Sequence, residues 1–436
     1  LRQEIPGRIN YKGSETAPLN LSELPAILAA FKDENVEAIA ICLLNSYANS
    51  AHEEALMTEV NKLWPEGAVS ASFQISREWR EYERTNTTVM SAYVQPITHK
   101  YLDDLTHRLT DAGMRCAPLI MQSNCGIDTV ANTRNTPITM IESGPASGIL
   151  GAAALGNLIG EKSVITLDIG GTTAKCSLIT NGEITLSSNN HVEKSDVSAG
   201  YPLLVPVVDL VEIGQGGGSI AWIDEFKRLR VGPQSAGASP GPVAYGMGGA
   251  DVTTTDANLA LGCINPDYFC GGSMTADMIG LNSTLAELAG ELNLSPQETA
   301  RGTVRLANNN MVNAIKLISV NRGHDPRDFT LIAFGGGGGM HACALAAELG
   351  IKKVIIPNHA GVFSAWGMLL SDLRRDYLRT QVVEMTADNA AAQLSAGLEA
   401  LEAQALAEYA AEDIAASRVS FKRYGRFRYQ NQEHST

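Results

Sequence analysis

The sequence predicts an α/β protein in which strands alternate with crossover helices. One supporting observation is residues 164–179, where an apolar run reaches an acid, turns through two glycines and continues as a second apolar run. Another is residues 329–350, where a β-rich run meets five glycines and then an alanine-rich helix that ends at Gly350. A third is the alternation of short apolar runs with amphipathic stretches along most of the remaining chain.

The N-terminal part shows this alternation after an irregular, turn-rich start. We expect helices at Leu21–Lys32 and His52–Leu63, a buried strand at Val36–Leu44, a strand–helix unit at Val69–Tyr93, and a long amphipathic helix from Pro96 to about Ala112. A strand at Pro118–Ser123 and a polar turn at 124–136 follow.

The second half contains the two glycine turns and a long irregular segment between them. A small-residue helix is expected from Ser143 to Leu155, and the hairpin extends over residues 164–186. Residues 187–255 are the least regular, and a stretch of this length and composition is typical of a functional loop or an interface. Further on we expect helices at 284–291, 296–320, 340–349 and 386–414, strands at 329–334 and 353–357, and a strand-like Arg426–Tyr429 segment.

The Gly-Gly turn at residues 168–173 is a candidate phosphate site. Asp168 ends the first strand, where it could hold a hydrated Mg²⁺, while Gly170 and Gly171 leave backbone amides uncovered and Thr172 and Thr173 add donors. The alternative is an ordinary hairpin turn, because Gly-Gly between two β-rich runs is common in hairpins.

The run Gly335–Gly339 is a second candidate ligand turn. Backbone without side chains lets a flat or phosphorylated ligand approach where any Cβ would clash. The run lacks Gly-Lys-Ser/Thr, so it is not a Walker loop, and poly-glycine satisfies a dinucleotide fingerprint trivially. A flexible linker is the alternative, although strand and helix signals adjoin the run on both sides.

Three further residues are candidates for catalysis, each with a structural alternative. Glu212 precedes a glycine cluster in the same manner as Asp168. Asp256 follows a strand-like run, and its more favoured interpretation is the N-cap of a helix starting at Ala257. His341 begins the helix after the five glycines, although a structural histidine is the more favoured interpretation.

Composition excludes several functional classes. The 436 residues carry a net charge of −14 and only 6% aromatic residues, which argues against nucleic-acid or anionic-membrane partners. Seven cysteines without a Cys-x-x-Cys pair favour reduced thiols and a cytoplasmic location. No apolar stretch long enough to span a membrane and no signal peptide are found, and the chain begins without Met, so we expect an internal piece of a longer polypeptide.

With both glycine turns in place, the chain resembles the hydantoinase A / 5-oxoprolinase family, within the superfamily of actin, the sugar kinases and the heat-shock ATPases. The matching segments span most of the chain: Arg80–Thr85, Asn86–Tyr93, Met121–Gly126, Ser143–Gly148, Asp168–Thr173, Glu212–Trp222, Val231–Ala238, Pro240–Pro242, Thr255–Asn258, Gly323–Arg327 and Ala333–Gly336. The resemblance implies a ribonuclease H-like fold of the actin/hexokinase type with a glycine-rich insertion.

The resemblance also implies roles for the motifs. Residues 168–173 look like the second phosphate hairpin of the superfamily, 143–148 like its connecting helix, and 335–338 like its adenosine turn. The first phosphate hairpin should lie upstream of residue 1. The family spends ATP to hydrolyse cyclic amides such as hydantoins or 5-oxoproline, related members carboxylate ketones, and many work with a second, B-type subunit.

We therefore expect an ATP- and Mg²⁺-dependent cyclic-amide hydrolase that needs upstream residues or a B-type subunit, or that forms a homo-oligomer. The alternatives are a subunit of an ATP-dependent ketone carboxylase and a non-catalytic, partner-binding paralogue. We expect the end of an N-terminal domain at 1–135, an ATPase-like domain at 136–380 with its insertion at 187–255, and the start of a C-terminal domain, a helix then a strand, at 381–436. The candidate residues are Asp168, Glu212, Asp256 and His341 for catalysis, Asp168 for the metal, and Gly170, Gly171, Thr172, Thr173, Gly335, Gly336, Gly337 and Gly338 for the nucleotide.

Overall fold

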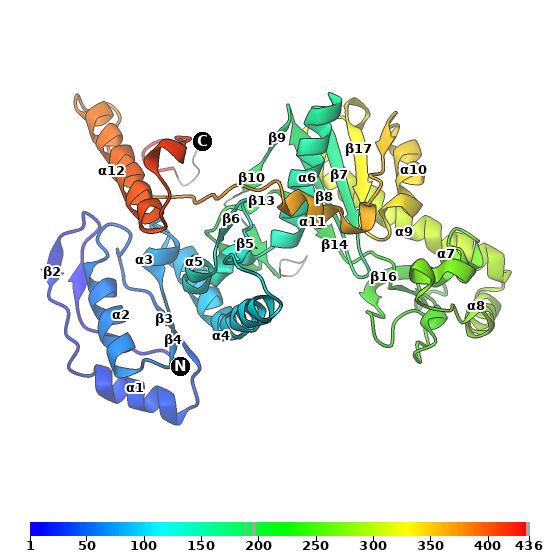
Figure 1. Ribbon diagram of the computed structural model, residues 1–436, viewed down its shortest axis with the longest axis horizontal. Coiled ribbons are helices and arrows are strands. Elements are labelled where there is room, and N and C mark those ends of the chain that lie inside the picture. Colours follow the sequence, from blue (N-terminus) through cyan, green and yellow to red (C-terminus); the bar gives the residue numbers. More distant parts are fainter. Residues whose placement is uncertain (188–189, 194–197, 433–436) are drawn as a thin grey trace.

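The computed structural model describes residues 1–187, 190–193 and 198–432. The molecule is elongated, with the N-terminal region at one end and the helices α7 (Thr254–Ala260) and α8 (Met278–Leu292) at the other (Figure 1). Helix α12 (Ala390–Ala411), although close to the end of the sequence, lies at the N-terminal end of the molecule. In the described part of the chain, no helix is both long and apolar enough to cross a membrane.

The N-terminal region is a small α/β unit. Strands β3 (Ala38–Ile41) and β4 (Ala68–Ala71) pair in parallel, joined by helix α2 (Ala51–Leu63). Their core contains the buried side chains Leu24, Leu28, Ile41, Leu56, Val60, Trp64 and Val69. The remaining elements are β1 (Arg8–Ile9), β2 (Glu15–Ala17), α1 (Leu24–Asp33) and α3 (Ser72–Ile75). The predicted helices and strands of this unit are confirmed.

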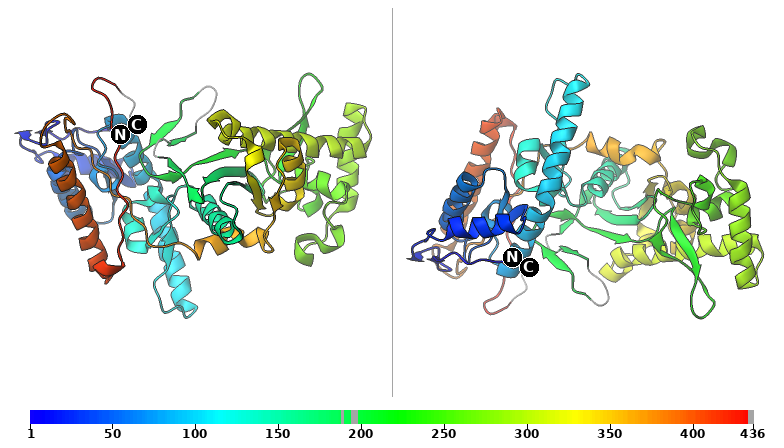
Figure 2. Two further views of the ribbon diagram at one scale, coloured as in Figure 1. Left: turned by 90° about the horizontal axis from the view of Figure 1, so that it is seen from above. Right: turned by 90° about the horizontal axis from the view of Figure 1, so that it is seen from below.

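Helix α4 (Glu81–Asp111) corrects the prediction that Pro96 opens a helix. The helix runs for 31 residues with Pro96 in its interior. Proline removes one backbone hydrogen bond and ordinarily kinks or ends a helix. Here buried side chains from Arg84 to Leu102 pack α4 against the rest of the molecule, and such packing stabilises a helix more than local propensity does. Figure 2 shows the C-terminal half of α4 extending away from the body.

The segment after α4 also differs from expectation. Strand β5 (Leu119–Met121) is confirmed, but the predicted polar turn contains strand β6 (Ile127–Thr129) and helix α5 (Val130–Asn135). Thr129 accepts a hydrogen bond from the Asn132 amide and so caps α5. Elements of three to six residues are too short to show a clear hydrophobic period, so they could not be predicted from the sequence. A short 3₁₀ helix (Pro137–Met140) follows.

The largest sheet has the order β14-β8-β7-β17-β18, with the short β9 paired to β8. Its strands are β7 (Val164–Ile169), β8 (Ala174–Thr180), β9 (Glu183–Ile184), β14 (Leu210–Ile213), β17 (Thr330–Phe334) and β18 (Val354–Ile355). The strand β7 runs antiparallel to β8 and parallel to β17, which is itself parallel to β18. The α/β prediction and the hairpin at 164–186 are confirmed.

Helices cover both faces of this sheet. On one face, Ile165, Leu167 and Ile169 share a core with helices α9 (Pro296–Ile318) and α10 (Gly338–Leu349). On the other face, Val164 and Ile332 share a core with helices α6 (Ser143–Ile159) and α11 (Phe363–Met368). Successive strand residues point to opposite faces, so each strand supplies both cores.

The insertion at 187–255 contains more structure than predicted, although residues 188–189 and 194–197 lie outside the described part. Short antiparallel pairs join β10 (Leu186–Ser187) to β13 (Val207–Val208) and β11 (Asn190–Val192) to β12 (Tyr201–Leu203). A longer hairpin consists of β15 (Ser219–Ile223) and β16 (Leu229–Ser235). The 3₁₀ helix Val243–Tyr245 leads toward α7.

The C-terminal elements are mostly as expected. The helix predicted at 296–320 is confirmed as α9, and Ser295 caps it with a reciprocal capping box to Glu298. Helix α8 begins at Met278, earlier than the sequence indicated, and the last helix, α12, is shorter than predicted. The strand predicted at Arg426–Tyr429 is not observed, because these residues pair with no strand of the described part of the chain. The remaining 3₁₀ helices are Pro266–Gly272, Val320–Arg322, Pro326–Asp328, Ala360–Val362 and Ala416–Arg418.

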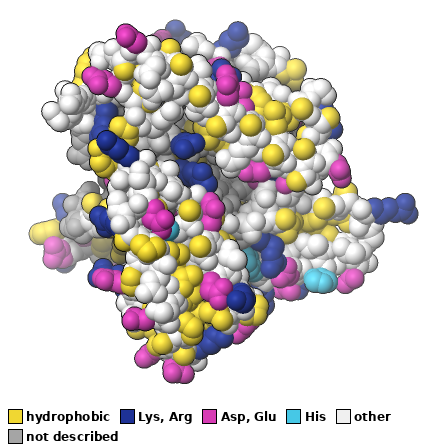
Figure 3. Space-filling view, turned by 90° about the vertical axis from the view of Figure 1, so that its left-hand side faces the viewer, with side chains coloured by type: hydrophobic (Ala, Val, Ile, Leu, Met, Phe, Trp, Pro, Cys, Tyr) yellow, Lys and Arg dark blue, Asp and Glu magenta, His cyan; other side chains and the backbone are white. Residues whose placement is uncertain are grey.

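The end of the molecule formed by the N-terminal region and α12 has a mixed surface. Figure 3 shows Lys and Arg side chains gathered in a hollow between two lobes, with acidic and hydrophobic side chains distributed around it. Arg426 and Glu78, and Arg423 and Glu402, form ion pairs in this part of the chain. Both charge signs therefore contribute to this face.

Candidate active site

The register of two parallel strands brings the two glycine turns together. In the β7–β17 ladder, Asp168 lies opposite Phe334, so both turns begin at the same edge of the sheet. The Gly337 amide donates a hydrogen bond to the Ile169 carbonyl at 2.9 Å. Gly335 has a φ of +80°, and a Cβ there would clash with the Asp168 carboxylate. Glycine is therefore required where the second turn crosses the first.

The first turn presents open backbone. The Gly170 amide closes the turn by donating to the Thr173 carbonyl at 3.0 Å. Gly170, Gly171 and Thr172 are exposed, and no atom of the described residues lies within 4 Å of the position that a Gly171 Cβ would take. Accessible amides in a tight turn are suited to hold an anion such as a phosphate group.

A third glycine cluster, Gly216–Gly218, supports the first turn from the insertion. The Gly217 amide donates to the Gly170 carbonyl at 3.0 Å, and the Gly218 amide donates to the Gly171 carbonyl at 2.6 Å. A Cβ on Gly216 would lie 2.7 Å from the Gly170 oxygen, too close for any side chain. The cluster therefore satisfies the carbonyls of the turn and fixes its shape. The sequence did not predict this contact.

Three charged side chains form a row across β7, β8 and β14. Asp168 lies opposite Lys175, and Lys175 lies opposite Glu212. Residues directly opposite each other in a ladder point to the same face of the sheet. The Lys175 Nζ atom lies 2.8 Å from Glu212 Oε1 and donates to Thr173 Oγ1 at 2.9 Å. Lys175 thus links Glu212, a candidate acid from the sequence, to the Gly-Gly turn at residues 168–173.

Asp168 differs from most half-buried acids in its hydrogen bonding. Within the described residues, no donor is found for its carboxylate, which is half-buried at the end of β7. Burial raises the pKa of Asp168, and the nearby Lys175 charge partly opposes that shift. A partly desolvated carboxylate without a protein partner is suited to bind a cation.

Glu142 is a site acid that the sequence analysis missed. It precedes helix α6 with a φ of +54°, a left-handed conformation that is uncommon for a residue with a side chain. Burial and the neighbouring Glu212 charge raise the pKa of Glu142, while Lys175 lowers it. Glu142 therefore lies beside the charged row. The only sequence signal for Glu142 is its position directly before Ser-Gly-Pro at the start of a helix.

The metal assignment rests on Asp168 together with phosphate oxygens. Among residues 1–187, 190–193 and 198–432, no cluster of three or more His, Cys, Asp or Glu side chains could hold a metal ion. Mg²⁺ in nucleotide sites is commonly held by one or two carboxylates, phosphate oxygens and waters. An unpartnered Asp168 beside open amides fits that donor set.

Asp256 has a different environment from Asp168. The predicted helix exists, but it starts at Thr254 with Thr253 as N-cap, so Asp256 is its third residue and not its cap. Its carboxylate accepts hydrogen bonds from the backbone amides of Val243, Ala244 and Thr253 and from the Thr253 hydroxyl. These contacts join α7 to the preceding loop.

His341 lies in α10, and its side chain contacts α9. Its Nδ1 atom is 2.7 Å from Asn308 Oδ1, and the residue is only 1% exposed. Burial lowers the pKa of His341 to about 4. The histidine is therefore neutral at physiological pH and connects two helices of the core.

Comparison with known protein families gives two matches. The model for Hydantoinase/oxoprolinase matches residues 84–377. The model for the Hydantoinase/oxoprolinase N-terminal region matches residues 1–63.

Individual relatives are longer than this chain. An uncharacterized protein from Methanocaldococcus jannaschii is 40% identical over 86% of this chain and 56% of its own length. The caprolactamase subunit alpha from Pseudomonas jessenii is 38% identical over 87% of this chain and 54% of its own length. The chain therefore spans about half the length of the curated relatives it matches.

Two solved structures share the fold over nearly the whole chain. The ATP-dependent caprolactamase from Pseudomonas jessenii superimposes with a TM-score of 0.81 and 34% identity, covering 99% of this chain and 62% of that one. A nucleotide-free acetone carboxylase superimposes with a TM-score of 0.79 and 27% identity, with the same coverage.

Proposed function

This chain belongs to the hydantoinase/oxoprolinase family, and from that premise we propose that it is the ATP-binding part of an ATP-dependent cyclic-amide hydrolase. Its substrates would be hydantoins, 5-oxoproline or related lactams. The observation that carries the proposal is the contact between the two glycine turns at Asp168, which supports a single nucleotide site formed by both turns. The similar caprolactamase from Pseudomonas jessenii is an ATP-dependent enzyme, as its name states.

The residues divide into those that hold the nucleotide and those that move protons. The turn Gly170–Thr173, whose Gly170 amide closes the turn, would hold the phosphates with its remaining amides. The run Gly335–Gly338 would lie against the adenosine, and Asp168 would hold Mg²⁺. When bound, Mg·ATP supplies a phosphoryl group that converts the resonance-stabilised amide into a better electrophile. Preorganised amides and Lys175 stabilise negative charge without needing to reorient.

Glu142 and Glu212 are the acids available for proton transfer. Burial and the neighbouring Glu212 charge raise the pKa of Glu142, which favours its protonated form over that of an exposed glutamate. In this proposal the pair accepts a proton from the attacking water. Asp256 and His341 are also candidates from the sequence, but both carboxylate oxygens of Asp256 and the Nδ1 atom of His341 are engaged inside the protein.

We also propose that the chain acts with a second, B-type subunit in the cytoplasm. The name of the similar caprolactamase chain identifies it as one subunit of a larger enzyme. The six cysteines whose side chains are described are all free thiols, as expected in a reducing compartment. We also propose that the domain boundaries lie at residues 135 and 380.

The second candidate function is ketone carboxylation. It is favoured by the fold similarity to acetone carboxylase over 99% of the chain. Nothing in the glycine turns separates it from amide hydrolysis, because both reactions need the same phosphoryl chemistry.

An ATP-turnover assay with alternative substrates tests the proposal. The chain, alone and with the product of a neighbouring B-type gene, is incubated with Mg·ATP and either caprolactam, 5-oxoproline, hydantoin, or acetophenone plus bicarbonate. We expect phosphate release that depends on one of the ring amides and a matching amount of ring-opened product. Release that depends only on the ketone would assign the second function. If no substrate causes phosphate release, even with the partner present, the result would support a non-catalytic, partner-binding role.

A further inference from the structure

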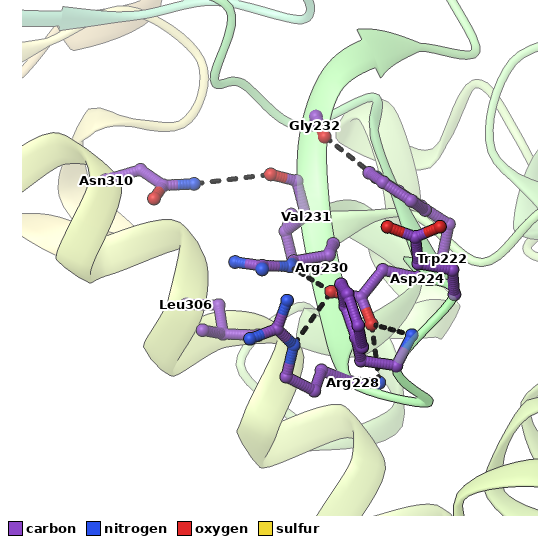
Figure 4. A pocket seen from close by; sticks show the side chains of 10 residues that line it. Trp222, Asp224, Arg228, Arg230, Val231, Gly232, Leu306 and Asn310 are labelled. Carbon is purple, nitrogen blue, oxygen red and sulfur yellow. Dashed lines mark hydrogen bonds and ion pairs between the residues drawn. The ribbon is translucent and has the colours of Figure 1, made fainter.

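A cavity separate from the glycine turns lies between the β15–β16 hairpin and helix α9. It has a volume of about 440 Å³, and its lining includes Trp222, Asp224, Arg228, Arg230, Leu306 and Asn310. Figure 4 shows the two arginine side chains extending from the hairpin toward the helix, which contributes Leu306 and Asn310.

This cavity and the contact with α10 lie on opposite faces of α9. Leu306 and Asn310 are four residues apart and so share one face of the helix. Asn308, which contacts His341 on α10, lies between them in sequence and points the other way. The cavity is therefore on the far side of α9 from α10, the helix that begins at the second glycine turn.

One carboxylate positions both guanidinium groups. Asp224 Oδ2 accepts a hydrogen bond from Arg228 Nε and another from Arg230 Nε, both at 2.9 Å. The other oxygen of Asp224 accepts from the backbone amides of Phe226 and Arg228. Burial opposes ionisation of Asp224, but these hydrogen bonds outweigh it and lower its pKa to about 2. Each carboxylate oxygen of Asp224 thus accepts two hydrogen bonds, and the carboxylate stays ionised.

The terminal amino groups of the two arginines have no acceptor in the described part of the chain. Only their Nε atoms have partners, so the paired N–H groups that bind carboxylate or phosphate in a fork remain available. Glu225, which also lines the cavity, forms no ion pair with either arginine among the described residues. Two oriented fork donors in one cavity form a preorganised anion site.

The remaining lining is apolar or already bonded. The Trp222 indole is fixed by donating to the Gly232 carbonyl at 2.8 Å, and the Asn310 amide donates to the Val231 carbonyl at 3.2 Å. The Arg228 guanidinium stacks over the Phe226 ring at 4.8 Å, which leaves its edge free for hydrogen bonds. A flat apolar body could therefore lie against Trp222 and Leu306.

We propose that this cavity binds a small organic anion that joins a carboxylate or phosphate group to an apolar or aromatic body. The anion pairs with Arg228 and Arg230, and the body contacts Trp222 and Leu306. This site is independent of the nucleotide site and of the reaction proposed above.

Isothermal titration calorimetry in the absence of nucleotide tests the site. The probes are benzoate, phenyl phosphate, neutral benzyl alcohol and inorganic phosphate, at low salt. We expect saturable binding of benzoate or phenyl phosphate, and binding at least about tenfold weaker for benzyl alcohol and inorganic phosphate. Whichever aromatic anion binds identifies the anionic group.

Four charge-neutralising variants complete the test. Arg228→Gln and Arg230→Gln should each weaken binding about tenfold, since each removes one fork. Arg305→Gln, an exposed arginine of α9 outside the cavity lining, is the matched control and should bind within about twofold of the parent. Glu225→Gln removes a like charge from the lining and should tighten binding about two- to threefold.

Two results would overturn the proposal. One is the absence of saturable heat with both aromatic anions up to about 20 mM, a concentration that saturates a site with a Kd of about 1 mM. The other is equal binding to the parent, Arg228→Gln and Arg230→Gln, because the arginines would then take no part.

Discussion

Two aspartates close to the glycine-rich segments have opposite surroundings. The Asp256 carboxylate is fully buried and accepts four hydrogen bonds, three of them from backbone amides. The Asp168 carboxylate is half-buried, and no donor to it is found in the described residues. The pKa of both is raised by burial, but hydrogen bonds oppose the shift only at Asp256. The comparison teaches that an acid is available for chemistry where the fold leaves its oxygens unpaired.

Removing the Asp256 carboxylate should have the largest effect on stability. Asp256→Ala leaves the buried amides of Val243, Ala244 and Thr253 without acceptors, so we expect a loss of about 3–5 kcal/mol of unfolding free energy. Urea denaturation measures it. The exposed Asp251→Ala is the matched control, expected within about 0.5 kcal/mol of the parent. Equal stability of the two variants would show that Asp256 does not hold the loop to α7.

Removing the Asp168 charge should affect catalysis and leave stability nearly unchanged. Asp168→Asn should lower ATP turnover about 10²- to 10³-fold, because the metal loses its protein ligand. Its unfolding free energy should stay within about 1 kcal/mol of the parent or increase, since a partly desolvated charge is removed. Turnover equal to the parent, measured with the responsive substrate, would remove Asp168 from the mechanism.

His341 extends the comparison to a base that the interior keeps neutral. Burial lowers its pKa from 6.5 to about 4, so as the pH falls through this range the unfolded state takes up a proton first. Above pH 6.5 neutral His341 makes its full contribution to the free energy of unfolding. This contribution should decline by about 3 kcal/mol as the pH falls toward 4. His341→Gln should lack this component. Parallel pH profiles of the parent and the variant in urea denaturation would contradict it.

The exposed capping box of α9 provides the smallest effect. Ser295 and Glu298 make the same reciprocal contacts as Thr253 and Asp256, but on the surface. Ser295→Ala should lower the unfolding free energy by about 1 kcal/mol, because water replaces the lost partner. If thermal or urea denaturation gave a loss as large as that for Asp256→Ala, burial would not explain the difference between the two sites.

The sequence predicted the parts of the site that carry strong local signals. An apolar run followed by adjacent glycines identifies a strand–turn unit at both 164–179 and 329–350 without knowledge of the fold, and the first unit also carries the acid Asp168. The motifs also identified the family. The sequence favoured a structural role for Asp256 but could not identify its partners, because the donor amides include those of residues 243 and 244, which only the folded chain brings close.

The features that the sequence did not predict depend on strand register or on very short elements. The support of Gly170 by Gly217 follows from the pairing of β14 with β8, which no local pattern specifies. Glu142 lies in a loop with no periodicity, so only its left-handed backbone and its neighbours reveal it. The strands of the insertion have two to seven residues, and most are too short for alternation to be recognised.

The most direct test of the account is a crystal structure of the chain with Mg²⁺ and a non-hydrolysable ATP analogue. We predict phosphate density against the turn Gly170–Thr173, the metal beside Asp168, and the adenosine next to Gly335–Gly338. Nucleotide bound elsewhere, with the edge shared by β7 and β17 empty, would contradict the account.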